Sequence, residues 1–198
     1  MALLNRFETD AHPSRRGAWW SVAALFVGLV LTAAGAPAAA PPSAEYQVKA
    51  VFLYNFAQFA EWPATMFPDA QSPIVIGILG DDPFGRYLDD LVQGEKLGNR
   101  SIIIRRYQDV GSIGECHVLF ISRSESSRLD GIVAVLKRRS ILTISDAETF
   151  TRRGGMVRFA MDSGKIRLRI NLEAAKACGL TISSKIVRPS TIVSAEND

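Results

Sequence analysis

Apolar side chains recur at helical spacing early in the chain. Within residues 45–61 they fall three or four positions apart, which predicts an amphipathic helix. Trp62-Pro63 ends this helix, because the residue before a proline disfavours helical geometry. The apolar positions of the helix are Val48, Val51, Phe52, Phe56 and Phe59.

The aromatic residues of this helix divide into two groups. Phe52, Phe56 and Phe59 form a stripe, which we expect in the core. Tyr54 and Asn55 fall off the stripe, so we expect both to be exposed. Exposed aromatic residues often anchor protein interfaces, which makes Tyr54 and Asn55 candidates for binding a partner.

Short apolar runs alternate with helical segments after this helix. Asp82-Pro83 starts one helix, with the aspartate as its cap, and residues 126–138 form another. This alternation predicts a single layered α/β domain, with a mostly parallel or mixed sheet flanked by helices. The predicted buried strands are 73–80, 102–107, 117–122 and 140–145.

The C-terminal part changes to an antiparallel pattern. Residues 156–161 and 165–170 are predicted to be strands of a β-hairpin, joined by Asp162-Ser163-Gly164. The glycine supplies the positive φ that such a turn needs. A helix over 172–178 follows, and a last short helix begins at residue 183.

Cations and aliphatic residues alternate along the second strand of this hairpin. Lys165, Arg167 and Arg169 fall on one face of the strand, and the aliphatic residues between them fall on the other. Arg158 on the neighbouring strand extends the basic face. Two interpretations remain open: a solvated face above a core, or a binding face for an anionic ligand or an acidic partner.

The first forty residues have a different composition from the rest. Arg15 and Arg16 precede an uncharged apolar run over 18–34, and small residues and prolines follow. This order is typical of a secretory signal peptide. Small side chains at Ala36 and Ala38 favour cleavage after Ala38, and the pattern fits either general or twin-arginine export. The alternative is an uncleaved anchor helix, for which the run is near the lower limit of about 17 residues.

These patterns divide the chain into four segments. Residues 1–38 are a signal peptide, 39–45 a short Pro/Ala-rich segment, 46–190 the α/β domain and 191–198 a flexible tail. No second long apolar run follows, so we expect no stable membrane insertion after cleavage. The net charge of +3 is too small to indicate nucleic-acid binding.

Few residues are available for redox or catalytic chemistry. Cys116 and Cys178 are the only cysteines, and they form either a disulfide or two separate buried thiols. His117 opens an apolar strand, where a structural role is expected. No nucleophile–base–acid arrangement and no metal-ligand spacing is visible, so we expect no enzyme activity, no cofactor and no metal site.

A series of motifs spread over residues 46–185 resembles the YfiR-like family of periplasmic regulatory proteins. Because the motifs occur in order along the chain, together they are more specific than any one alone. They are YQVKA (46–50), FLYNF (52–56), EWP (61–63), IGILGDDPFG (76–85), CHVLFIS (116–122), TISD (143–146), GGM (154–156), INL (170–172) and LTISSK (180–185).

The resemblance implies a regulatory role in the periplasm. It implies that the protein binds and represses the periplasmic sensor domain of an inner-membrane diguanylate cyclase. Such repression lowers cyclic-di-GMP and restrains biofilm formation. A homodimer is a further expectation. The alternative is a periplasmic sensor that binds a small ligand without direct control of a cyclase.

Overall fold

The computed structural model describes residues 41–195, which form one α/β domain with a mixed sheet at its centre. Its helices are α1 (Ala44–Phe59), α2 (Arg86–Val92), α3 (Leu129–Leu136), α4 (Leu172–Ala177) and α5 (Ser184–Val187). Single 3₁₀ turns or short 3₁₀ helices lie at η1 (Ala64–Met66), η2 (Val110–Ser112) and η3 (Arg123–Arg128). The predicted α/β class is confirmed.

The main sheet has eight strands within the described residues. In spatial order they are β10 (Thr191–Ile192), β8 (Lys165–Ile170), β7 (Val157–Asp162), β6 (Leu142–Ser145), β5 (Val118–Ile121), β2 (Ile74–Leu79), β4 (Arg100–Tyr107) and β3 (Lys96–Leu97). Strands β4, β2, β5, β6 and β7 run parallel, as the apolar runs predict. A separate two-stranded pair joins β1 (Ala60–Glu61) to β9 (Thr181–Ile182).

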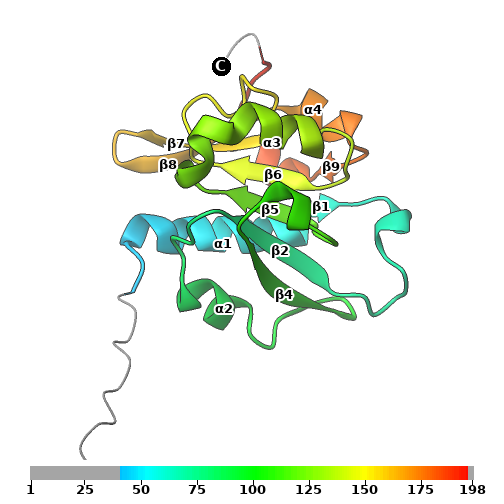
Figure 1. Ribbon diagram of the computed structural model, residues 1–198. Helices are drawn as coiled ribbons and strands as arrows, with labels where there is room; N and C mark the ends of the chain where they lie inside the picture. Colours follow the sequence, from blue (N-terminus) through cyan, green and yellow to red (C-terminus); the bar gives the residue numbers. More distant parts are fainter. Residues whose placement is uncertain (1–40, 196–198) are drawn as a thin grey trace, which may run out of the picture. The chain divides into compact units, whose positions relative to one another are not determined.

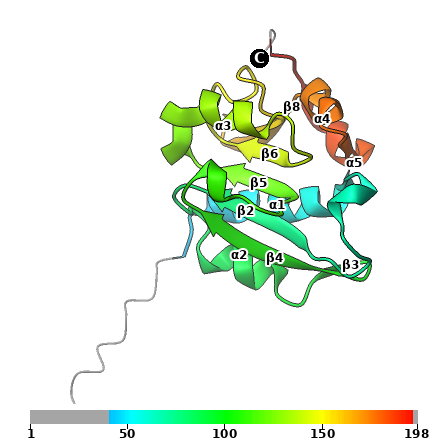
Figure 2. The ribbon, with the colours of Figure 1, turned by 45° about the vertical axis from the view of Figure 1, so that its right-hand side comes forward.

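The central strands are buried on both faces because helices cover both. Along β2, Ile76 and Ile78 belong to one buried cluster and Leu79 to another, since neighbouring side chains of a strand point to opposite faces. The first cluster includes α1 and α2, and the second includes α3. Figures 1 and 2 show α3 on the near face of the sheet and α1 behind it.

The predicted C-terminal hairpin is confirmed. Strands β7 and β8 pair antiparallel, with Asp162 opposite Lys165. Ser163 has φ of 49° and Gly164 has φ of 74°. Two positive φ values in a two-residue loop match the right-handed twist of the strands. The hairpin projects beyond α3 on the left of the view (Figure 1).

The chain after the last helix continues the sheet. Thr191 and Ile192 form β10, which pairs parallel with the end of β8. The Val193 amide donates to the Ile170 carbonyl at 3.0 Å, and the Val193 side chain is buried. Thr191 and Ile192 therefore form a strand of the sheet, and Val193 is held beside it.

The inward face of α1 differs from the predicted one. Phe56 is buried, as expected, but Phe52 and Phe59 are only partly buried at the margin of the core. Val48 and Val51 are 48% and 40% exposed. The sheet-facing side consists instead of Lys49, Ala50, Leu53, Phe56 and Ala57. Two alanines let the helix lie close to the sheet, and the buried charge of the lysine is compensated there, as described below.

The domain holds no helix that is long and apolar enough to span a membrane, as far as residues 41–195 are concerned. The predicted signal peptide (1–38), its cleavage site and the start of the Pro/Ala-rich segment lie outside the described residues.

Candidate functional site

The outer side of α1 carries a mostly apolar stripe, in which two valines are exposed and two phenylalanines are partly buried. Its residues are one helical turn apart and follow the spacing of a single face, so they form one continuous surface. Val48 and Val51 are exposed valines, and the ring of Phe52 packs 5.8 Å from that of Phe159 in β7. We call this stripe the α1 surface; it consists of Val48, Val51, Phe52, Asn55 and Phe59.

A shallow groove borders the α1 surface at its C-terminal end. The groove has a volume of about 140 Å³ and lies between α1, β8 and α5. The Lys185 ammonium lies 5.0 Å from the centre of the Phe59 ring, which places a cation over the apolar floor. The lining residues are Phe52, Asn55, Phe59, Leu168, Lys185, Ile186 and Pro189.

The two polar residues predicted on this helix separate in the structure. Asn55 is half-buried and lies on the α1 surface, in the groove. Tyr54 is also half-buried, and its hydroxyl donates to Glu95 Oε2 at 3.0 Å. This hydrogen bond ties α1 to the segment between α2 and β3. Tyr54 therefore connects two elements, whereas Asn55 remains at the surface.

The basic residues of the hairpin lie on one face, as their alternation predicts. Lys165 and Arg167 are exposed, and Arg158 lies directly opposite Arg169 on the neighbouring strand. Arg167 Nε is 3.8 Å from Asp162, and Arg158 donates to the Glu148 carbonyl. Some of these cations are therefore engaged within the domain, and Lys165 and Arg167 present the most accessible charge.

Sequence reasoning missed a buried ionic cluster beneath α1. Lys49 is 1% exposed, and its ammonium contacts Asp146 Oδ2 at 2.6 Å and Glu45 Oε1 at 2.5 Å. Arg123 Nη2 and the Tyr46 hydroxyl also reach Asp146 Oδ2, at 3.1 and 2.9 Å. A lysine among the apolar residues of a core helix, with an aspartate after a buried strand, is the only sequence signal for it.

The cations around Asp146 keep its carboxyl ionised. Burial alone would raise the pKa of this carboxyl, but hydrogen bonds from Lys49 and Arg123 outweigh burial and lower it. The pKa of Tyr46 is raised to about 12, by burial first and then by the Asp146 charge. Tyr46 therefore stays a hydrogen-bond donor at neutral pH.

The cluster joins three elements at the carboxyl ends of the central strands. Arg123 and Asp146 follow β5 and β6, so both lie at the carboxyl ends of parallel strands. Lys49 and Glu45 come from the first turns of α1. Ion pairs at this point fix how α1 is rotated on the sheet, and they keep Lys49 inward so that Val48 and Val51 face outward.

The two cysteines are separate free thiols, not a disulfide. Cys116 is packed on the α3 side of the sheet, and burial raises its pKa to about 12. Cys178 follows α4 and donates to the Lys137 carbonyl at 3.2 Å. A bridge is absent because the thiols lie in different buried clusters, with separate partners.

His117 has a structural environment. The ring is 2% exposed, stacks on Phe67 at 4.7 Å and accepts a hydrogen bond at Nδ1 from the Val75 amide at 3.0 Å. Burial lowers its pKa to about 4, so the ring is neutral at physiological pH. No group of three or more His, Cys, Asp or Glu side chains suited to a metal ion occurs in residues 41–195.

The comparisons with known proteins identify the family. Residues 46–190 match the YfiR/HmsC-like family. The chain belongs to this family. YfiR/HmsC-like proteins are periplasmic and regulatory rather than enzymatic. The comparison with curated proteins found no match to the sequence.

The motifs that carry the family resemblance meet in the structure. Tyr46 and Lys49 of the YQVKA motif contact Asp146 of the TISD motif, although about a hundred residues separate them. In this YfiR/HmsC-like protein, these motifs therefore build the ionic cluster that orients α1.

Proposed function

We propose that this protein binds and represses the periplasmic sensor domain of an inner-membrane diguanylate cyclase, and so lowers cyclic-di-GMP and biofilm formation. Two findings support the proposal. The chain belongs to a regulatory family, and its α1 surface leaves apolar side chains open to a partner. Contiguous apolar side chains that remain open at the surface mark sites of protein interaction.

A cation beside the α1 surface indicates which charge a partner would present there. Lys185 borders the groove, whereas Lys165 and Arg167 lie on the face of β8 opposite to Leu168, which lines the groove. We propose that the sensor domain offers an apolar anchor to the α1 surface and a carboxylate to Lys185. Complementary charge raises the rate of encounter and excludes unsuitable partners.

Export is part of the proposal. We propose that residues 1–38 act as a cleavable signal, so that the domain reaches the periplasm. The first experiment is to measure intracellular cyclic-di-GMP in the native bacterium with and without the gene. We expect a rise on deletion that the full chain reverses and a version lacking residues 1–38 does not. Unchanged cyclic-di-GMP under several growth conditions would contradict the proposal.

A pair of matched valines tests whether the α1 surface is the docking site. Val48 on α1 and Val135 on α3 are exposed to similar extents, 48% and 52%. We expect Val48→Asp to lower affinity for the sensor domain at least about tenfold and to leave cyclic-di-GMP high, because a charge replaces an apolar anchor. In the deletion strain, Val135→Asp should lower cyclic-di-GMP as far as the wild-type protein does.

Both valine variants should unfold at the same urea concentration as the wild type, because each residue is at the surface. If Val48→Asp and Val135→Asp repress equally well, docking does not use the α1 surface.

A small-ligand sensor is a second candidate function. A hollow of about 390 Å³ lies above the ionic cluster, within the size range of ligand pockets. Phe159 and Met161 form an apolar side of this hollow, and the charged side holds both cations and carboxylates: Glu45, Lys49, Arg123, Asp146 and Glu148. A thermal-shift screen against periplasmic metabolites tests this function, since a ligand stabilises the folded state by mass action.

A further inference from the structure

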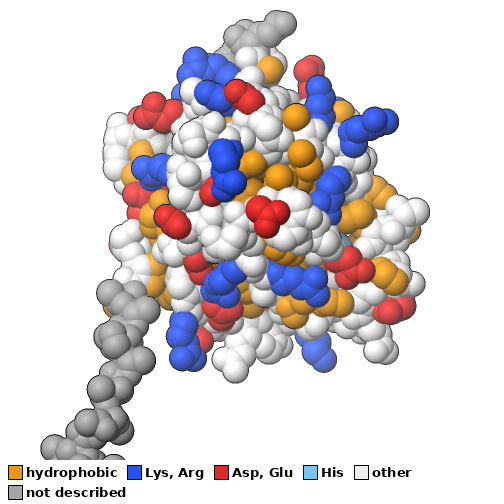
Figure 3. Space-filling model, viewed as in Figure 1, with side chains coloured by type: hydrophobic (Ala, Val, Ile, Leu, Met, Phe, Trp, Pro, Cys, Tyr) orange, Lys and Arg blue, Asp and Glu red, His pale blue; other side chains and the backbone are white. Residues whose placement is uncertain are grey.

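An apolar groove lies on the α3 side of the domain, between α3 and α4. Figure 3 shows apolar side chains gathered there, with Lys and Arg side chains around them. The groove has a volume of about 90 Å³, and its surface is almost entirely apolar. Its lining residues are Val133, Leu136, Lys137, Thr143, Gly154, Met156, Ala174, Ala177 and Cys178.

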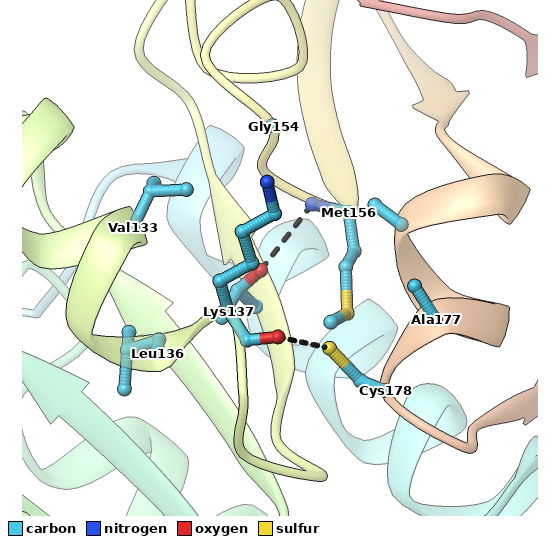
Figure 4. Close-up of a pocket in the computed structure, with 9 residues that line it drawn as sticks. Val133, Leu136, Lys137, Gly154, Met156, Ala177 and Cys178 are labelled. Atoms are coloured by element: carbon cyan, nitrogen blue, oxygen red, sulfur yellow. Dashed lines mark hydrogen bonds between the residues drawn. The ribbon is translucent and has the colours of Figure 1, made fainter.

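The groove exists because two buried clusters meet there without filling the space. Val133 and Leu136 belong to the cluster under α3, and Met156 and Cys178 to the cluster that includes α1 and α4. The wall on the α4 side is formed by alanines, which leave room that larger side chains would fill. Figure 4 shows Val133 and Leu136 on one side, Ala177 on the other and Met156 between them.

Hydrogen bonds hold the ends of the two helices at a fixed separation. The Cys178 thiol donates to the Lys137 carbonyl at 3.2 Å, and the Ser140 hydroxyl donates to the Cys178 carbonyl at 2.8 Å. These bonds link the C-terminal end of α3 to that of α4. The groove is therefore preformed, so binding in it does not require the helices to be ordered first.

Lys137 supplies the only charged group of the lining. Its side chain runs along the mouth of the groove toward Gly154 (Figure 4). Among residues 41–195, no acidic side chain forms an ion pair with this ammonium. An apolar slot with an unpaired cation at its mouth is complementary to a molecule with an apolar chain and an anionic end.

We propose that the α3–α4 groove binds a short aliphatic carboxylate. The alkyl chain occupies the slot between Leu136, Met156 and Ala177, and the carboxylate pairs with the Lys137 ammonium at the mouth. The size of the groove limits the chain to a few carbons. A ligand this small, held in a surface groove, should have an affinity on the order of millimolar.

The proposal is tested by titrating the purified ¹⁵N-labelled protein with hexanoate and following amide shifts by NMR. Three probes separate the parts of the ligand: 1-hexanol lacks the charge, hexylamine reverses it, and acetate lacks the chain. We expect saturable shifts at the amides of Lys137, Gly154 and Ala177, with hexanoate binding roughly threefold to tenfold more tightly than 1-hexanol. Hexylamine and acetate should bind more weakly than hexanoate.

Two variants and one control assign the site. Lys137→Ala should reduce hexanoate affinity to that of 1-hexanol, whereas Lys176→Ala, on the exposed side of α4, should leave it unchanged. Ala177→Phe fills the groove from its exposed wall and should abolish binding of both compounds.

The NMR spectrum of each variant also reports whether it is folded. Equal affinity for hexanoate and 1-hexanol, equal affinity of the two lysine variants, or binding that survives Ala177→Phe would overturn the proposal. Because the α1 surface contributes no residue to this groove, failure here leaves the proposed repression of a cyclase intact.

Discussion

Lys49 shows how one buried charge decides which residues are available to a partner. A helical lysine that is 1% exposed is costly unless it is paired. Asp146 and Glu45 provide this pairing, and Arg123 and Tyr46 complete the set of donors around Asp146. Once Lys49 is held inward, helical geometry places Val48 and Val51 outward.

Removing the lysine should be far more harmful than removing a surface lysine. Lys49→Ala leaves the Asp146 carboxylate buried without its closest cation, so we expect a loss of about 3 kcal/mol in the free energy of unfolding. Lys176→Ala, on the exposed side of α4, should change the free energy of unfolding by less than about 0.5 kcal/mol. Urea unfolding followed by circular dichroism measures both. Equal stability of the two variants would mean that the ionic cluster does not hold α1.

His117 should make the domain sensitive to mild acid. Its pKa is lowered from 6.5 to about 4, mainly by burial. The unfolded chain therefore binds more protons between these values, and stability should fall as the pH falls from about 6.5 to about 4. The Asp146 pKa is lowered from 3.8, so its contribution is lost only at lower pH.

The measurement is the Tm at pH 7 and at pH 4.5, where we expect a decrease on the order of 5 °C for the wild type. His117→Asn is the control, because the Asn oxygen can replace Nδ1 as acceptor for the Val75 amide without titrating. A wild-type decrease no larger than that of the variant would rule out His117 as its cause.

At the scale of elements, local patterns predicted the strands and the hairpin well. Continuous apolar runs gave β2, β5 and β6, since a strand buried on both faces has no other signature. The Ser163-Gly164 turn and the alternation along β8 predicted the hairpin and its basic face. The strands and the hairpin depend on residues that are close together in the sequence, so local patterns are enough to predict them.

The rotation of α1 could not be predicted in this way. Both sides of the helix contain apolar residues, so periodicity alone does not decide which side is buried. The deciding contact joins Lys49 to Asp146, and these residues are neighbours only in the folded domain. The separate positions of Cys116 and Cys178 likewise depend on tertiary structure, which the number and spacing of cysteines do not specify.

At the scale of the whole molecule, the sheet ends in two different edges. On one side, β10 pairs with the last residues of β8. On the other, β3 pairs with Arg100 and Ser101 only, so no described strand covers the outer side of β4 from Ile102 to Tyr107. An open edge of this length can pair with another chain.

Charged side chains are the usual protection of such an edge, and the open stretch of β4 carries two. Arg106 bonds Asp82 and Asp89, so it is engaged in holding α2 against the strand. Arg105 is exposed and precedes it, next to the half-buried Ile103 and Ile104. We infer that the positive charge of Arg105 keeps the edges of two molecules apart.

Replacing this charge by a strand-forming apolar residue should therefore cause association. We expect Arg105→Val to form larger assemblies than the wild type as the protein concentration rises, measured by size-exclusion chromatography with light scattering. Arg152→Val removes an exposed charge away from the sheet edges and should behave as the wild type. Because Arg105 belongs neither to the α1 surface nor to the groove beside it, repression by Arg105→Val at low concentration should be retained. If Arg105→Val elutes as the wild type at every concentration, the edge is protected by its shape rather than by its charge, and a homodimer would have to use another surface.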